Sequence, residues 1–347
     1  MSAATYEKLR TLSFLSIVMV LYNHSTNLVV NYTFGSEYMT EIVATFIQRV
    51  SKDSLTRVNR PLFFTIAACL FFWTLEPHAK AFFKKFKRRF VSLTIPYVIC
   101  LVLSMLVVAV CTHLPVLKTF ITRYAITNYS PLDLLHNLIR DPLFYQMWFI
   151  RNLMIWVLCS PLIYIFVSRL GWWSVPLSLG FWLSDFVMPV EKVGLCFFCI
   201  GAVIGVKKPA LEKFKIPQPT LWLLLWLALA CLHIVLDINE NIWAERVQKA
   251  GMLVGFVAVW CNYDRLPERF RRWLQNWVPF TFFIYLFHEP LLTASKKFFF
   301  YVVPLNPYTS LGLFMIMPLL VMPVLIAVGR RFKQWNEKIY YIVTGGR

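Results

Sequence analysis

Long apolar stretches separated by short polar segments run along the whole chain. A helix needs roughly 20 apolar residues to cross the hydrocarbon core of a bilayer, and about ten stretches approach or exceed that length. We therefore expect an all-α, polytopic integral membrane bundle of about ten transmembrane helices, with no soluble domain, internal repeat or low-complexity segment. The predicted spans cover residues 11–31, 61–76, 93–113, 145–167, 170–187, 192–206, 218–237, 249–263, 278–296 and 303–328.

The segments between the spans differ in character. Residues 79–90 alternate Lys or Arg with Phe, which is typical of an amphipathic helix lying on the membrane surface. Residues 32–60 and 114–144 are predicted to be two sizeable external loops. All of these segments belong to a single predicted membrane domain, residues 1–347.

Composition agrees with a membrane protein. The chain is 59% hydrophobic and only 15% charged, whereas soluble domains carry roughly 25% charged residues. Its formal net charge is +18, but the basic residues lie between apolar spans instead of forming one face, which argues against nucleic acid and for membrane lipids as partners. Cys196 and Cys199 form a C-x-x-C pair inside an apolar run without a second pair, so we expect no metal site there.

The distribution of basic residues predicts an orientation. With ten spans, the connections on the side of both termini carry nearly twice as many Lys and Arg residues as the opposite connections. The positive-inside rule therefore places both termini in the cytoplasm. Lys296 and Lys297, at the external end of the ninth predicted span, are the main exception.

Several polar residues lie within the predicted spans, where an ionisable side chain costs on the order of 3 kcal/mol. In the predicted orientation they reach a similar depth on the external side of the midplane, which predicts a polar cavity. The ionisable residues are His24, Arg60, Arg151, His288 and Glu289, and Asn23, Trp148 and Tyr285 lie beside them.

Each of the five ionisable residues also has a purely structural interpretation. His24 could hydrogen-bond a neighbouring helix, and Arg60 could anchor a helix end by extending towards the interface. Arg151 could form a structural ion pair with Glu289 or Asp185. If the ninth span ends early, the histidine and carboxylate at its outer end lie beside a loop instead.

A cavity of this composition supports a narrow range of chemistry. A neutral histidine can accept a proton from a hydroxyl, a carboxylate can orient the imidazole, and arginines can hold an anion or a developing oxyanion. Acyl transfer to a hydroxyl uses all of these groups, and so does proton-coupled transport. Residue types alone leave both open.

Five segments in order resemble the motifs of one family. The first is Leu9-Arg10, followed by an apolar helix ending in Tyr22-Asn23-His24-Ser25, and the second is Arg60-Pro61-Leu62-Phe63-Phe64-Thr65-Ile66. The third is the basic run Lys87-Arg88-Arg89-Phe90, which leads to Ile95-Pro96-Tyr97. The last two are Gln146-Met147-Trp148-Phe149-Ile150-Arg151-Asn152-Leu153 and Ile284-Tyr285-Leu286-Phe287-His288. Together these segments resemble acyltransferase family 3, integral membrane O-acyltransferases that modify glycans and related acceptors.

The resemblance implies a reaction and roles for residues. A cytoplasmic acyl-CoA, commonly acetyl-CoA, would supply an acyl group to a hydroxyl of an extracytoplasmic polysaccharide or lipid-linked sugar, with no bound cofactor. His24 matches the family's essential histidine, and Arg10, Arg88 and Arg89 match its donor-binding positions. The basic run also suits orientation and binding of anionic lipid. The location implied is the bacterial inner membrane.

The chain departs from the family pattern at three places. Arg10 precedes His24 by nearly one helical turn more than usual, Ala67-Ala68 replace Ser-Gly, and Ser92 stands where a further arginine is common. Two other functions stay open: export of a polysaccharide or lipid-linked sugar without acyl chemistry, and a non-catalytic subunit of an assembly complex.

Overall fold

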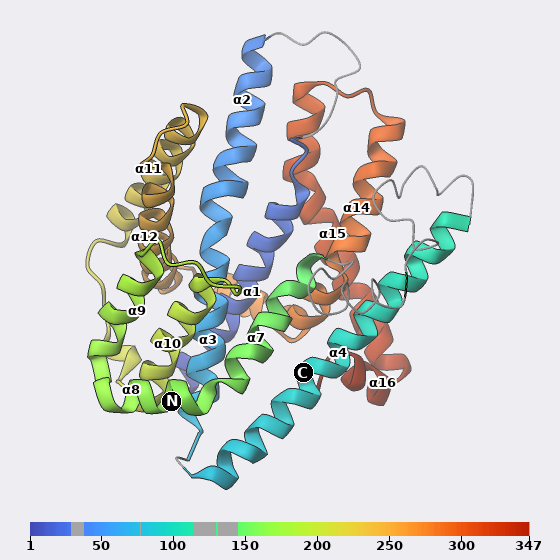
Figure 1. The fold of residues 1–347 in the computed structure, drawn as a ribbon. Coiled ribbons are helices and arrows are strands. Elements are labelled where there is room, and N and C mark those ends of the chain that lie inside the picture. Colours follow the sequence, from blue (N-terminus) through green and yellow to red (C-terminus); the bar gives the residue numbers. More distant parts are fainter. Residues whose placement is uncertain (29–37, 77, 114–129, 131–144, 347) are drawn as a thin grey trace.

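The computed structural model describes residues 1–28, 38–76, 78–113, 130 and 145–346, and these residues form helices and no strand (Figure 1). The predicted all-α class is therefore confirmed. The α-helices are α1 Ala3–Ser25, α2 Tyr38–Arg49, α3 Asn59–Trp73, α4 Ala79–His113, α7 Trp148–Leu158, α8 Ser160–Leu170, α9 Ser174–Leu183, α10 Lys192–Lys207, α11 Pro219–Ile238, α12 Ala244–Tyr263, α13 Glu268–Gln275, α14 Thr281–Val302, α15 Pro307–Trp335 and α16 Glu337–Val343. Shorter helical turns are η1 Val50–Ser54, η2 Leu55–Val58, η4 Tyr145–Met147, η5 Gly171–Trp173, η6 Leu211–Lys213 and η7 Val278–Phe280.

Among the described residues, five helical segments are long and apolar enough to cross a membrane. They support a multi-pass membrane protein, while the count of ten spans and the side that each terminus faces stay predictions. Helices α1 and α14, with 23 and 22 residues, have sufficient length but carry more polar side chains. The five segments are Met39–Trp73, Ala79–Val110, Ser160–Leu183, Pro219–Ile238 and Pro307–Trp335.

The first predicted external loop, 32–60, is wrong from residue 38 onwards. Helix α2, the π-helical turn η1 and the 3₁₀ turn η2 run directly into α3. Residues 38–73 are therefore continuously helical, with no loop before the second predicted span. The sequence of this segment is too polar for a hydropathy criterion, yet several of its polar groups face other helices. The second predicted loop, 114–144, lies almost entirely outside the described residues.

The predicted fourth span, 145–167, is two helices instead of one. Helix α7 ends at Leu158, and α8 starts afresh with Pro161 in its first turn, where the missing N–H of proline breaks no helical hydrogen bond. In Figure 1, α7 slants towards the lower left and α8 continues across the lower left of the view. Asp185, predicted to lie within the fifth span, is exposed beyond the end of α9.

The predicted surface helix 79–90 is the first part of α4, which continues through Pro96 into the third predicted span. Lys85 lies in this part and donates hydrogen bonds to Phe71 O and, at 2.7 Å, to Thr74 Oγ1 at the end of α3. A cation suits this position because the last carbonyls of a helix carry partial negative charge. Contact of the segment with a membrane surface stays a prediction.

Helices α3 and α10 pack closely along small residues. A Cβ added at Gly201 would lie 2.2 Å from Thr65 O, and one at Gly205 would lie 2.8 Å from Cys69 O, so only glycine permits this approach. Gly201 and Gly205 form a GxxxG pair, which is typical of close helix contacts in membranes. Ala68, which replaces the family's glycine, is buried against Gly201.

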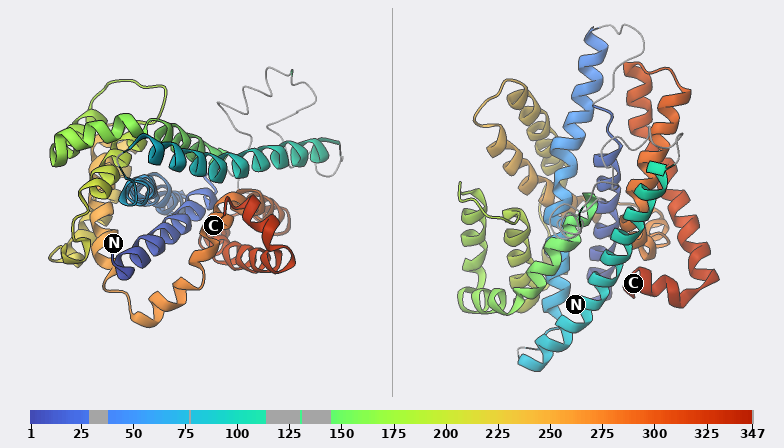
Figure 2. Two further views of the ribbon diagram at one scale, coloured as in Figure 1. Left: turned by 90° about the horizontal axis from the view of Figure 1, so that it is seen from below. Right: turned by 45° about the vertical axis from the view of Figure 1, so that its right-hand side comes forward.

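Helices α1 and α3 lie near the middle of the bundle. Seen from below, α4 runs along one side of them, α14 to α16 occupy a second side, and α8 to α12 occupy a third (Figure 2). The N- and C-termini both lie in the lower half in the side views (Figures 1 and 2). The upper end of α1, where His24 lies, is thus surrounded by η1, α14 and α15.

Candidate functional site

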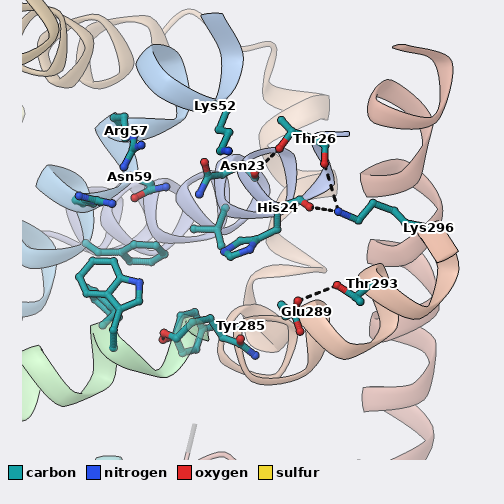
Figure 3. Close-up of a pocket in the computed structure, with 16 residues that line it drawn as sticks. Asn23, His24, Thr26, Lys52, Arg57, Asn59, Tyr285, Glu289, Thr293 and Lys296 are labelled. Carbon is teal, nitrogen blue, oxygen red and sulfur yellow. Dashed lines mark hydrogen bonds between the residues drawn. The ribbon is translucent and has the colours of Figure 1, made fainter. Parts of the chain in front are cut away.

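A partly open cavity of about 430 Å³ lies where the end of α1 meets η1, the start of α3, the start of α7 and the middle of α14 (Figure 3). In the described part of the chain its lining is mostly polar, with four cationic side chains and one carboxylate. The lining residues are Val20, Asn23, His24, Thr26, Lys52, Arg57, Asn59, Arg60, Phe63, Gln146, Trp148, Phe149, Tyr285, Glu289, Thr293 and Lys296.

The structure brings together most of the residues that the sequence predicts for the cavity. Arg151 and His288 are the two that do not line it, and Arg151 Nε instead donates to Asn152 Oδ1 at 3.4 Å on α7. His288 lies directly behind the lining, against His24. The predicted residues that line the cavity are Asn23, His24, Arg60, Trp148, Tyr285 and Glu289.

His24 is the second-to-last residue of α1, and a lysine from α14 fixes this helix end. Lys296 Nζ donates to His24 O at 2.7 Å and approaches Thr26 O at 3.4 Å (Figure 3). Because the last carbonyls of a helix lack intrahelical partners, an ammonium group there satisfies them and stabilises the helix end. Lys296 thereby fixes the backbone of His24, and with it the position of the imidazole at the cavity.

His24 and His288 form a ring pair. Their centroids are 5.3 Å apart at an interplanar angle of 64°. His288 Nδ1 lies 2.9 Å from Tyr285 O and 3.1 Å from Ile284 O, and both are acceptors, so this nitrogen carries the hydrogen. The fully buried Nε2 of neutral His288 is therefore an acceptor, and it has no hydrogen-bond partner in the described part of the chain.

Pro290 shapes the α14 wall of the cavity. Proline has no N–H, so the carbonyl four residues earlier, that of Leu286, is left without its helical donor. Gln146 Nε2 approaches this carbonyl at 3.4 Å, and Tyr285 donates its hydroxyl to Gln146 O. The start of α7 and the middle of α14 are thereby joined at the cavity. One turn further, Glu289 Oε1 accepts from Thr293 Oγ1 at 2.8 Å.

Arg60 lies on the opposite wall and is held on two sides. Its guanidinium donates to the Glu191 carboxylate at 3.3 and 3.4 Å, and its Cζ lies 5.1 Å from the centre of the Trp148 ring. Glu191 immediately precedes α10, so the ion pair joins α3 to α10 at this end. Arg60 therefore presents a fixed, partly neutralised positive charge to the cavity.

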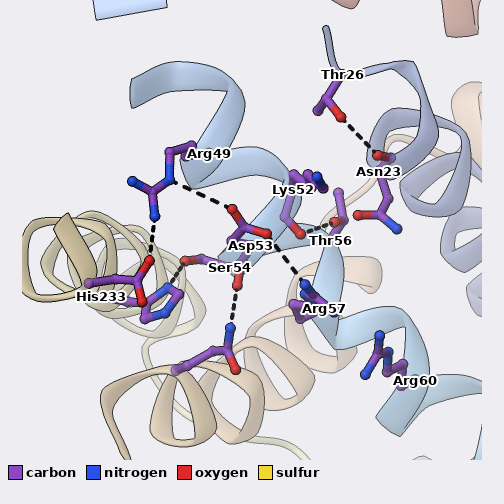
Figure 4. A network of polar contacts seen from close by, with 12 residues as sticks. Asn23, Thr26, Arg49, Lys52, Asp53, Ser54, Thr56, Arg57, Arg60 and His233 are labelled. Atoms are coloured by element: carbon purple, nitrogen blue, oxygen red, sulfur yellow. Dashed lines mark hydrogen bonds and ion pairs between the residues drawn. The ribbon is translucent and has the colours of Figure 1, made fainter. Parts of the chain in front are cut away.

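The upper wall is the π-helical turn η1 and the 3₁₀ turn η2, which present Lys52 and Arg57 (Figure 4). Insertion of a π-turn shifts the side chains that follow it around the helix, and such turns are frequent at functional sites. Arg57 donates to Asp53 Oδ1 at 3.3 Å.

Helices α11 and α12 support this wall from outside the cavity. Asp53 Oδ2 lies 3.9 Å from Arg49 Nε, and the Arg49 guanidinium also forms an ion pair with Asp237 of α11. Gln248 of α12 donates to Asp53 O at 2.7 Å. Ser54 and His233 form a further buried hydrogen bond of 2.6 Å between η1 and α11 (Figure 4).

The predicted donor-binding residues lie on the first part of α1 and the first part of α4. Arg10 is exposed with its Cζ 5.8 Å from the ring centre of Tyr6, and Arg89 also interacts electrostatically with Tyr6. Arg88 is exposed next to Arg89. The starts of α1 and α4, which carry these arginines, both lie in the lower part of Figure 1, whereas α1 ends higher up.

Several polar residues that line the cavity are not among the site residues that the sequence predicts. Lys52, Arg57 and Asn59 fall in the predicted loop 32–60, and Lys296 is the last residue of the predicted ninth span, 278–296, whereas α14 continues to Val302. The exception that Lys296 and Lys297 make to the positive-inside pattern was the available signal, because a misplaced lysine near a span often faces protein. Gln146 and Thr293 carried no such signal.

The described residues include no group of three or more His, Cys, Asp or Glu side chains placed to hold a metal ion. Within the cavity, His24 is accompanied by one carboxylate, Glu289. The arrangement instead supplies a histidine, hydrogen-bond donors and cations, which suit proton transfer and binding of an organic substrate.

Comparison with known proteins gives one finding. A family model described as "Acyltransferase domain" matches residues 8–329, which include every element that lines the cavity. No curated protein and no solved structure matches the chain significantly. The match covers nearly the whole chain and agrees with the five motifs in the sequence. The chain therefore belongs to acyltransferase family 3 and is a membrane acyltransferase.

Proposed function

We propose that this protein is an O-acyltransferase of the bacterial inner membrane that transfers an acetyl group from cytoplasmic acetyl-CoA to a hydroxyl of an extracytoplasmic polysaccharide or lipid-linked sugar. The observation that carries the proposal is the position of His24 in an acyltransferase-family chain. Its imidazole lines a polar cavity and contacts a second buried histidine.

The reaction needs a base at the acceptor hydroxyl. In the proposal, His24 accepts the hydroxyl proton while the oxygen attacks the thioester carbonyl, and the C–S bond then breaks as CoA leaves and takes up a proton from the imidazolium. A transient acyl-histidine is the alternative route, in which His24 itself attacks the thioester first. The cationic side chains of the cavity would stabilise the oxyanion of either tetrahedral intermediate.

The donor is proposed to enter from the end that carries Arg10, Arg88 and Arg89, where guanidinium groups suit the phosphates of CoA. Arg10 and His24 are about 21 Å apart along α1, at roughly 1.5 Å per residue. The pantetheine arm of the donor would therefore extend along α1 to bring the thioester to His24. The N-terminal end of the molecule would face the cytoplasm.

The decisive experiment measures consumption of labelled acetyl-CoA by the purified protein in liposomes. We expect the wild type to hydrolyse or transfer the acetyl group, and His24→Ala to lose about 10²- to 10⁴-fold of that rate, as for removal of a general base. Thermal unfolding of both proteins serves as the control for folding.

Two results would contradict the proposal. Full activity in a folded His24→Ala protein would remove the assigned role of His24. If the wild type neither binds nor consumes any acyl-CoA when candidate acceptors are present, export of a polysaccharide or lipid-linked sugar becomes the better interpretation of the cavity.

A further inference from the structure

The cavity carries more positive than negative charge. Among the described residues that line it, Lys52, Arg57, Arg60 and Lys296 are cationic and Glu289 is the only carboxylate. Glu191 and Asp53 neutralise two of these cations in part, from outside the lining. An excess of cations in a partly enclosed space is costly unless an anion balances it.

Two cationic groups on the η1–η2 wall have unused hydrogen-bonding capacity. Among the described residues, Lys52 Nζ makes no hydrogen bond or ion pair, although Lys52 is only partly exposed. Arg57 Nε is buried and lacks an acceptor in the same part of the chain, while the other side of the guanidinium donates to Asp53. A buried donor is normally satisfied, so Arg57 Nε, with the Lys52 ammonium on the same wall, suits a ligand that carries an acceptor oxygen.

The wall that carries these groups lies close to the proposed base. Lys52 and His24 line the same cavity, and the charge of Lys52 acts electrostatically on His24. In Figure 3 the Lys52 and Arg57 side chains descend from the upper wall towards Asn23 and Asn59. A single small molecule in this cavity can therefore contact Lys52, Arg57 and His24.

We infer that the acyl acceptor carries an oxyanion, a phosphate or a carboxylate, beside the hydroxyl that is acylated, and that Lys52 and Arg57 bind this group. The inference rests on the proposed function, because it takes the ligand of the cavity to be the acceptor. It narrows the acceptor to acidic or phosphorylated sugars among the hydroxylated compounds that the cavity could hold.

The donor does not account for these cations equally well. The charged phosphates of acyl-CoA lie at the nucleotide end, whereas its thioester end, which must reach His24, is uncharged. Arg10, one of the proposed phosphate-binding arginines, lies about 21 Å from His24 along α1, at roughly 1.5 Å per residue. The acceptor is therefore the substrate that can bring a negative charge to Lys52 and Arg57.

Direct binding tests this inference without any acyl donor. The purified protein in nanodiscs would be titrated with methyl glucoside, methyl glucuronoside and glucose 6-phosphate, which share a sugar ring and differ in charge. We expect at least one anionic probe to bind about tenfold more tightly than the neutral probe, as for one charge-assisted hydrogen bond. Comparison of the two anionic probes distinguishes a carboxylate from a phosphate.

The variants Lys52→Met and Arg57→Gln should each abolish most of that preference and leave binding of the neutral probe within about twofold. Lys213→Met is the matched control, since Lys213 is exposed in η6 and remote from the lining. Equal binding of all three probes by the wild type would overturn the inference. So would a preference that survives in both cavity variants, or variants that raise only the KM for acetyl-CoA.

The outcome is separable from that of the proposed function. If the anionic probe binds through Lys52 and Arg57 but acetyl-CoA is never consumed, the anion site stands and the acyltransfer proposal falls. If acetyl-CoA is consumed through His24 but no probe shows a charge preference, the acyltransfer proposal stands and the anion site falls.

Discussion

The first turn of helix α3 and its middle turns differ in how closely they are packed. At its start, Asn59 and Arg60 face a cavity, and neighbouring polar atoms such as Asn23 Oδ1 and Gln146 Oε1 lack partners in the described structure. Further along, Thr65 and Cys69 present backbone carbonyls to the glycines of α10 at a distance that excludes any side chain. The same helix thus borders an unfilled polar space and a closely packed contact.

This difference in packing indicates where substitutions should affect folding and where they should affect activity. Close packing leaves no room for extra atoms, so a larger residue in the α3–α10 contact destabilises the whole bundle. Polar groups without partners contribute little to stability, and changing them should alter ligand binding or catalysis instead. The following predictions test this division, from the largest expected effect to the smallest.

Gly201→Leu should cause the largest loss of stability. The new side chain would meet Thr65 O and Ala68 Cβ, and we expect the free energy of unfolding to fall by about 3 kcal/mol. Thermal unfolding of the purified protein measures it. Gly180→Leu on α9 is the control, because a Cβ at that position meets nothing within 4 Å. Similar unfolding temperatures for the two variants would contradict the assigned packing.

His288→Ala should reduce acyl transfer about tenfold to a hundredfold, by freeing the His24 ring that it contacts. His288→Asn should retain more activity, because its amide can still donate to the Tyr285 or Ile284 carbonyl. The measurements are kcat and KM for acetyl-CoA together with the pH profile of the rate. Unchanged kcat in a folded His288→Ala protein would show that His288 does not position His24.

Lys296→Met should remove the cap on the end of α1 at a cost of about 1 kcal/mol, since a cation there satisfies the last carbonyls. Hydrogen exchange at the end of α1 would detect the loss as faster local opening. Lys338→Met, an exposed substitution on α16, serves as the control. If exchange at Asn23 to Ser25 does not change, the cap is not a stabilising contact.

Asp237→Asn should have the smallest effect. It breaks the ion pair with Arg49 behind η1, which is partly exposed and therefore contributes about 0.5 kcal/mol. We expect nearly unchanged stability and anion affinity reduced by no more than about threefold. A larger loss of affinity with intact folding would mean that this pair actively positions Arg57.

Much of the fold could be predicted because apolar length and order are local properties of the sequence. The predicted boundaries of 192–206 and 218–237 agree with α10 and α11 to within a residue, and the all-helical class follows from the same pattern. The motifs identified the family, and the order of the spans predicted that His24, Arg60 and Glu289 share one cavity. Each of these inferences needed only the order of spans or motifs along the chain.

Only the tertiary structure decided which polar segments are buried inside the bundle. Residues 38–58 have the composition of a loop, and they are helical because Gln48, Ser54 and Asp53 meet partners on other elements. Lys296 is a charged residue at the end of a predicted span, and only the structure shows that it lies within α14 with its Nζ donating to His24 O at the end of α1. A hydropathy pattern assigns each residue to lipid or water, whereas polar residues that are satisfied by protein form a third class that only packing defines.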